Sequence, residues 1–147
     1  LIDDTHKIKI NGRDALLMHG DTLCTDDIEY QRFRQMVRST QWKQDILSKS
    51  LEERIQIAKG LREQSQQSNT EKEDYIMDVN QDATDGAFRD NQVDLLIHGH
   101  THRPAAHRLQ LGERQVTRID LGNWYSAGRA LVVDTDGWRW LEVDCPG

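Results

Sequence analysis

The chain has 147 residues, with 19 lysines and arginines against 25 aspartates and glutamates, which gives a formal net charge of −6. An acidic balance argues against a general nucleic-acid binder, because such proteins carry a basic footprint. No apolar run exceeds four residues, whereas a membrane-spanning helix needs about 20, so we expect no transmembrane segment.

The length predicts one domain that is large enough to bury a hydrophobic core. The two cysteines, Cys24 and Cys145, are too few for a disulfide framework and suit a reducing cytoplasm. The chain begins Leu1-Ile2-Asp3, without a starting methionine or a signal segment, so we expect it to be part of a longer protein.

A β-hairpin is the first predicted element. Residues Lys7 to Ile10 alternate polar and apolar, Asn11-Gly12 is a two-residue turn signal, and Ala15 to Met18 form a more apolar second strand. His19 follows directly, so the hairpin delivers an imidazole at the end of a strand.

Two amphipathic helices should follow, at about Asp26–Arg38 and Gln44–Glu63, joined near Ser39-Thr40. Positions 31–72 hold nine Lys or Arg against five Asp or Glu, a net charge of +4. The apolar stripe of the two helices is compatible with ordinary core packing or with a helical lid over a lipid. The basic residues of the helices suit a solvated face or a membrane surface.

Residues 64–72 are rich in Ser, Gln and Asn, a composition typical of a linker. A third helix is expected from about Glu71 to Asp90, where apolar residues recur at helical spacing. The positions expected to face inward are Ile76, Met77, Val79, Ala83 and Ala87.

A short buried strand, Leu95 to Ile97, then runs into His98-Gly99-His100-Thr101-His102. Three histidines in five residues offer neutral nitrogen ligands for a transition metal, at the carboxyl end of a strand where functional groups collect in α/β sheets. A surface histidine cluster is the simpler alternative. We favour the metal, because so apolar a strand rarely ends in such a sequence by accident.

Four more strands are predicted after this loop, and we expect them to be antiparallel and to finish the sheet. They are Ala106–Leu111, Gln115–Asp120, Ala130–Asp134 and Trp138–Asp144.

The sequence Gly99-His100-Thr101-His102 resembles the last metal motif, G-H-x-H, of the calcineurin-like metallophosphoesterases. Two further strings, 18–27 (MHGDTLCTDD) and 76–81 (IMDVNQ), are similar to the members of that family that cleave a lipid nucleotide in lipid A synthesis. The resemblance runs from about Arg13 to Tyr125.

The resemblance implies an α/β fold, namely the C-terminal part of an αββα sandwich with a helical lid insertion at about 26–72. Residues 1–147 would then be the C-terminal portion of one domain. By the same resemblance, the family's first three metal motifs, D-x-H, G-D with a following acidic residue, and G-N-x-D, would precede the point where this sequence starts. We therefore expect the N-terminal portion of the same protein as a partner, and no pyrophosphatase activity from these residues alone.

The resemblance also implies the site residues. His19 and His100 would bind one ion and His102 the other, in a centre with two Mn²⁺, and Asp21 and Asp120 are candidates to orient the histidine rings. The expected substrate-binding residues are Asp27, Ser65, Asn69, Lys72 and His100.

The implied reaction is hydrolysis of the pyrophosphate bond of UDP-2,3-diacylglucosamine, to UMP and 2,3-diacylglucosamine 1-phosphate, by metal-bound hydroxide. The implied location is peripheral, on the cytoplasmic face of the bacterial inner membrane. One alternative is a calcineurin-like phosphodiesterase acting on a soluble nucleotide, since the segment 39–67 is rich in Gln, Lys and Glu. Another is a non-enzymatic membrane-surface module.

Overall fold

The computed structural model of the chain describes residues 4–71, 76–124 and 127–144. It divides into two units. Leu1–Leu23 and Val79–Gly147 form one, which we call the sheet unit, and Cys24–Asp78 form the other, the helical unit.

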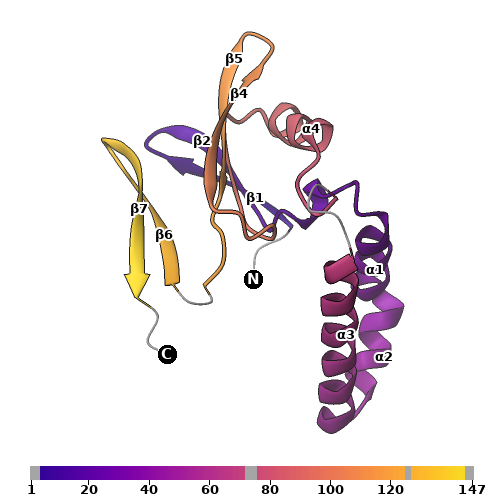
Figure 1. The fold of residues 1–147 in the computed structure, drawn as a ribbon. Coiled ribbons are helices and arrows are strands. Elements are labelled where there is room, and N and C mark those ends of the chain that lie inside the picture. The colour runs from indigo at the N-terminus through magenta and orange to yellow at the C-terminus, as the bar shows by residue number, and fades with distance from the viewer. Residues whose placement is uncertain (1–3, 72–75, 125–126, 145–147) are drawn as a thin grey trace. The chain divides into compact units, whose positions relative to one another are not determined.

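The sheet unit is built on a five-stranded mixed sheet (Figure 1). Its strands are β1 (Thr5–Ile10), β2 (Arg13–Met18), β3 (Leu95–His98), β4 (Ala105–Leu111) and β5 (Arg114–Asp120). Their order across the sheet is β1-β2-β3-β5-β4, with β3 parallel to both β2 and β5. β1 and β4 are antiparallel edge strands. The expected α/β class is therefore confirmed.

Local turn chemistry explains the first hairpin. Asn11 and Gly12 both have positive φ, at 50° and 77°, which a two-residue turn matching the strand twist requires. The hairpin predicted from Asn11-Gly12 is confirmed, and so is the pair β4 and β5, whose turn includes Gly112 at φ 62°.

The last two strands correct one expectation. β6 (Ala127–Asp134) and β7 (Gly137–Asp144) form the predicted antiparallel pair, but they make a separate two-stranded sheet instead of finishing the first one. Alternation of apolar residues predicts a strand without saying which sheet it joins, because that choice depends on distant backbone partners.

Helix α4 (Gln81–Asn91) covers one face of the sheet. It begins later than the expected Glu71, because the Asn80 side chain accepts a hydrogen bond from the Ala83 amide at 3.1 Å and caps the helix. Ile76 and Met77 lie in a turn before this cap, so placing them on an inward helix face was wrong.

The core under α4 brings strand, loop and helix residues together. Its buried members are Leu16, Leu23, Phe88, Val93, Leu96 and Val116. Val79, Ala83 and Ala87 pack against this cluster, as predicted, although Val79 lies before the start of α4 and not in a helix.

The helical unit holds α1 (Ile28–Arg38), α2 (Thr40–Ser48) and α3 (Leu51–Glu71). The break predicted near Ser39 is confirmed, and the Ser39 hydroxyl accepts a hydrogen bond from the Trp42 amide at 3.2 Å. Within the described ranges, no helix is long and apolar enough to cross a membrane.

The second predicted helix, Gln44–Glu63, is in fact two helices. Ser50 and Glu53 form a reciprocal cap, in which the Ser50 amide donates to the Glu53 carboxylate at 2.8 Å and the Glu53 amide donates to the Ser50 hydroxyl at 3.2 Å. The sequence Ser-Leu-Glu-Glu is a capping-box signature that marks a helix start. α3 then continues to Glu71, so positions 64–71 are helical and do not form the linker that their composition alone would indicate.

Candidate active site

His19 and His100 lie close together in the sheet unit. β2 ends at Met18 and β3 at His98, and these strands are parallel neighbours, so the residues that follow them emerge at the same edge of the sheet. The two imidazole centroids are 5.0 Å apart, with ring planes inclined at 56°. The sheet therefore joins the two histidines that the sequence assigned to one ion.

Gly20 permits this close approach. The Gly99 amide donates a hydrogen bond to the His19 carbonyl at 3.1 Å, which ties the two loops together. A Cβ atom on Gly20 would lie 2.7 Å from the Gly99 oxygen and 2.8 Å from His98 Nδ1, and Gly20 has φ 106°. Steric overlap and backbone conformation both require glycine there.

His100 has a strained backbone. Its φ is 73°, and the Thr101 amide donates to the Gly99 carbonyl at 2.9 Å, so His100 is the central residue of a γ-turn with positive φ. His102 is also left-handed, at φ 58°. Such conformations are uncommon for residues with a side chain, and they concentrate at functional sites.

The surroundings of His100 favour its neutral form. Burial lowers the pKa of His100 from its ordinary value, and the charge of the neighbouring His19 lowers it further. Asp21 opposes this shift. A neutral imidazole is the form that binds a metal ion.

The two candidate orienting carboxylates make different contacts. Asp21 is 3% exposed, and its Oδ1 lies 3.3 Å from Nδ1 of His19, as expected for an acceptor that orients this ring. Asp120 instead accepts hydrogen bonds from the Thr101 hydroxyl and, at 2.8 Å, from the Gly122 amide. It thereby holds the loop that carries the histidines.

His98 has a different setting from the other two histidines of its cluster. It is 1% exposed, Arg118 donates to its Nε2 at 3.1 Å, and its Nδ1 lies 2.8 Å from the Gly99 carbonyl. Sequence reasoning missed Arg118, since nothing near it along the chain suggested a partner. The strand register, which aligns Arg118 with Leu96, explains the contact.

The histidines at this edge of the sheet could supply some of the ligands of a metal centre. His19 is exposed and its Nδ1 faces Asp21, which leaves Nε2 for a cation. His100 lies beside it, and His102 is exposed on the same loop. Among the residues that the structure describes, no three His, Cys, Asp or Glu side chains converge into a complete ligand set.

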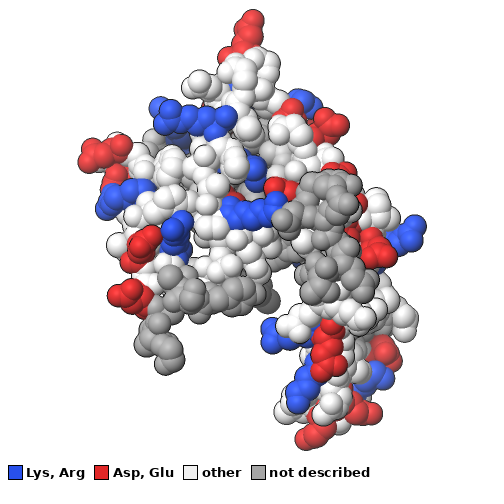
Figure 2. Space-filling view, in the orientation of Figure 1, with Lys and Arg blue, Asp and Glu red and all other residues white. Residues whose placement is uncertain are grey.

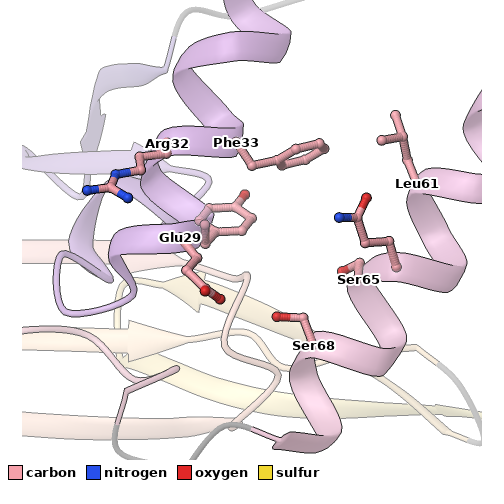
Figure 3. Close-up of a pocket in the computed structure, with 8 residues that line it drawn as sticks. Glu29, Arg32, Phe33, Leu61, Ser65 and Ser68 are labelled. Atoms are coloured by element: carbon pink, nitrogen blue, oxygen red, sulfur yellow. The ribbon is translucent and has the colours of Figure 1, made fainter.

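The helical unit contains a pocket of about 360 Å³ between α1 and α3 (Figure 3), a volume within the range of small-molecule sites. The Phe33 ring reaches from α1 toward Leu61 of α3, and the Ser65 and Ser68 hydroxyls lie along the α3 side. The residues that line the pocket are Glu29, Tyr30, Arg32, Phe33, Leu61, Gln64, Ser65 and Ser68. Apolar walls with a few polar groups are typical of a ligand site.

The other expected substrate residues have varied positions. Ser65 lines the pocket. Asp27 is buried and caps α1, accepting from the Tyr30 amide at 3.0 Å. Asn69 lies in α3, but its side chain is outside the described part of the chain, as is all of Lys72. The apolar stripe in the sequence included Tyr30, Phe33 and Leu61 without indicating that they face a cavity.

Comparison with known proteins gives consistent matches. Residues 3–104 match the model of the calcineurin-like phosphoesterase family. The chain is 44% identical over 145 residues to a UDP-2,3-diacylglucosamine hydrolase of Stenotrophomonas maltophilia (strain K279a), covering 94% of this chain and 58% of that protein. Proteins of the same name from Chromohalobacter salexigens and Bordetella pertussis are 46% and 47% identical, over 84% and 87% of this chain. The chain spans 50% and 52% of their lengths.

Proposed function

Because this chain belongs to the calcineurin-like phosphoesterase family, we propose that the full polypeptide containing it hydrolyses the pyrophosphate bond of UDP-2,3-diacylglucosamine, releasing UMP and 2,3-diacylglucosamine 1-phosphate. The observation that carries the proposal is the pairing of His19 and His100 at the ends of two parallel strands, with ring centroids 5.0 Å apart. The names of the relatives support the choice of substrate.

In this proposal His19 and His100 bind one divalent cation and His102 contributes to a second, with Mn²⁺ as the metal. When bound, such a pair supplies a hydroxide nucleophile at neutral pH and neutralises charge on the attacked phosphate. Asp21 orients the His19 ring, and the lowered pKa of His100 keeps its imidazole available as a ligand. The remaining ligands come from the N-terminal portion of the protein, so residues 1–147 are one portion of its catalytic domain.

The helical unit would bind the acylated sugar of the substrate. Phe33 and Leu61 offer apolar surface in the pocket, while Ser65 offers a hydroxyl on the α3 side, where Leu61 also lies. Asp27, Asn69, Lys72 and His100 complete the proposed substrate contacts.

We also propose a peripheral location at the cytoplasmic face of the inner membrane, where a lipid nucleotide would be presented. Several apolar side chains of the helical unit are exposed, which supports contact with lipid. These are Ile28, Met36, Leu47, Leu51 and Ile55. Figure 2 shows blue and red side chains interspersed over the visible face of these helices, so the apolar contacts carry this proposal rather than a basic patch.

The test is UMP release from UDP-2,3-diacylglucosamine with Mn²⁺, by the full polypeptide and its variants. His19→Ala and His100→Ala should each lower turnover by more than the about 10–100-fold that a lost second-shell contact causes. His6→Ala is the matched control, since His6 is exposed on β1 and should be dispensable.

Hydrolysis of a soluble phosphodiester, without hydrolysis of the lipid nucleotide, would favour the alternative of a phosphodiesterase acting on a soluble nucleotide. Lipid binding without any metal-dependent turnover would favour a membrane-surface module.

A further inference from the structure

His98 is almost completely buried, although it lies only two residues before His100. Its exposure is 1%, and strand alternation puts it on the same face of β3 as the core residue Leu96. A buried imidazole must have its nitrogens satisfied, so its partners reveal what it does.

Arg118 determines which nitrogen of His98 carries the proton. The Arg118 guanidinium is 3.1 Å from Nε2, and a guanidinium can only donate. Nε2 is therefore the acceptor, and in the neutral ring the proton lies on Nδ1. Nδ1 then donates to the Gly99 carbonyl at 2.8 Å.

The Gly99 carbonyl belongs to the peptide group that leads into His100. It accepts from the Thr101 amide as well as from His98, and the orientation of this peptide group sets the φ of 73° at His100. The same peptide group stacks against Gly20, since a Cβ there would lie 2.7 Å from the Gly99 oxygen. The His98 contact thus acts on a backbone conformation that His100 adopts only under constraint.

We propose that Arg118 and His98 form a positioning pair that holds the strained turn presenting His100 to a divalent cation. Arg118 selects the His98 tautomer, and that tautomer fixes the Gly99 carbonyl. The inference rests on the proposed function only in taking His100 as a metal ligand, and it gives neither member of the pair a direct role in the reaction.

The first test is the protonation state of His98 in the full polypeptide, read from imidazole ¹⁵N–¹H correlation spectra at pH 7.5. A neutral ring with its proton on Nδ1 is expected, and Arg118→Met should let the other tautomer appear while Arg118→Lys preserves the original. A proton on Nε2 in the unmodified protein would overturn the proposal.

The second test compares His98→Asn with His98→Gln. An asparagine amide nitrogen occupies nearly the place of Nδ1 and keeps the donor to Gly99, whereas glutamine reaches toward Arg118 and loses that donor. Both variants lose one hydrogen bond of the pair, so their thermal midpoints should fall by similar amounts. We expect Mn²⁺ affinity to weaken about 10–100-fold in His98→Gln and by no more than about threefold in His98→Asn.

Equal Mn²⁺ affinities in the two variants would contradict the positioning role, because a merely structural contact would not separate them. The affinity measurement uses no substrate. Therefore, if the variants behave as expected but the full polypeptide does not cleave the lipid nucleotide, the substrate assignment fails and the positioning pair stands.

Discussion

The amide of Gly99 donates a hydrogen bond to the carbonyl of His19 at 3.1 Å, and this contact joins two loops that are far apart in the sequence. Each loop follows a parallel strand and carries candidate metal ligands, His19 after β2 and His100 with His102 after β3. The separation of the two imidazoles therefore depends on backbone contacts as well as on the histidines. Changes in this backbone should affect metal binding even where no ligand is altered.

Gly20→Ala should disrupt this junction. The new Cβ would overlap the Gly99 oxygen and His98 Nδ1, and φ 106° is strained for alanine. We expect a loss of about 1–3 kcal/mol from the backbone conformation and about 1–3 kcal/mol from overpacking, measured by urea unfolding. Mn²⁺ affinity should fall as well.

Gly112→Ala is the matched control for Gly20→Ala. Gly112 also has positive φ, at 62°, but a Cβ there meets nothing within 4 Å. It should lose only about 1–2 kcal/mol, the cost of left-handed backbone, and leave Mn²⁺ affinity unchanged. If both variants lost the same stability and neither lost affinity, the contact between Gly20 and Gly99 would not matter for the site.

The stability of the metal-free protein should depend on the protonation of His100. Burial and the charge of His19 lower its folded-state pKa below the ordinary 6.5. The unfolded chain therefore binds the proton more readily, so stability rises with pH through this interval. The contribution is complete above pH 6.5 and is lost as pH falls through the lower, folded-state pKa.

Urea unfolding in the presence of a chelator, at pH 7.5, 6.5 and 5.5, measures this dependence. Replacing His100 by Asn should flatten the curve between pH 6.5 and 5.5, since it removes the titrating ring. An unchanged slope in His100→Asn would assign the pH dependence to other groups.

Ser50→Ala should weaken the start of α3. The Ser50 hydroxyl accepts from the Glu53 amide at 3.2 Å, and loss of such an N-cap costs about 1 kcal/mol. Ser48→Ala is the control, because the Ser48 hydroxyl donates to the Asp45 carbonyl near the end of α2 and caps no helix start. Helix content by circular dichroism during thermal unfolding should separate the two variants.

Phe33→Ala should weaken binding of the acylated substrate by the full polypeptide. The Phe33 ring lines the pocket opposite Leu61, and loss of apolar contact from one such side chain corresponds to roughly a tenfold rise in KM. The chemical step should change little, because the residue is assigned to substrate binding. Leu141→Ala removes an apolar side chain that is 53% exposed on β7, outside the helical unit, and serves as the control. A large fall in kcat at unchanged KM in Phe33→Ala would contradict a role in binding.

Local sequence determined much of this protein. Asn11-Gly12 allows one kind of tight turn, so the first hairpin follows from two residues. The change from apolar residues to Gly-His-x-His also predicted where β3 ends and which histidines follow it. The match to the calcineurin-like phosphoesterase family agrees with that motif. Even the break missed at Ser50 was encoded locally, as a capping box.

Only the tertiary structure decided which residues meet across the chain. Three histidines in five residues looked alike in sequence, but strand register buries His98 against Arg118, while His100 lies beside His19. The separate sheet of β6 and β7 and the pocket facing Phe33 likewise depend on partners distant in sequence. Periodicity fixes which face of an element is apolar, whereas the partner of that face is fixed by packing and hydrogen bonding between segments that no local pattern describes.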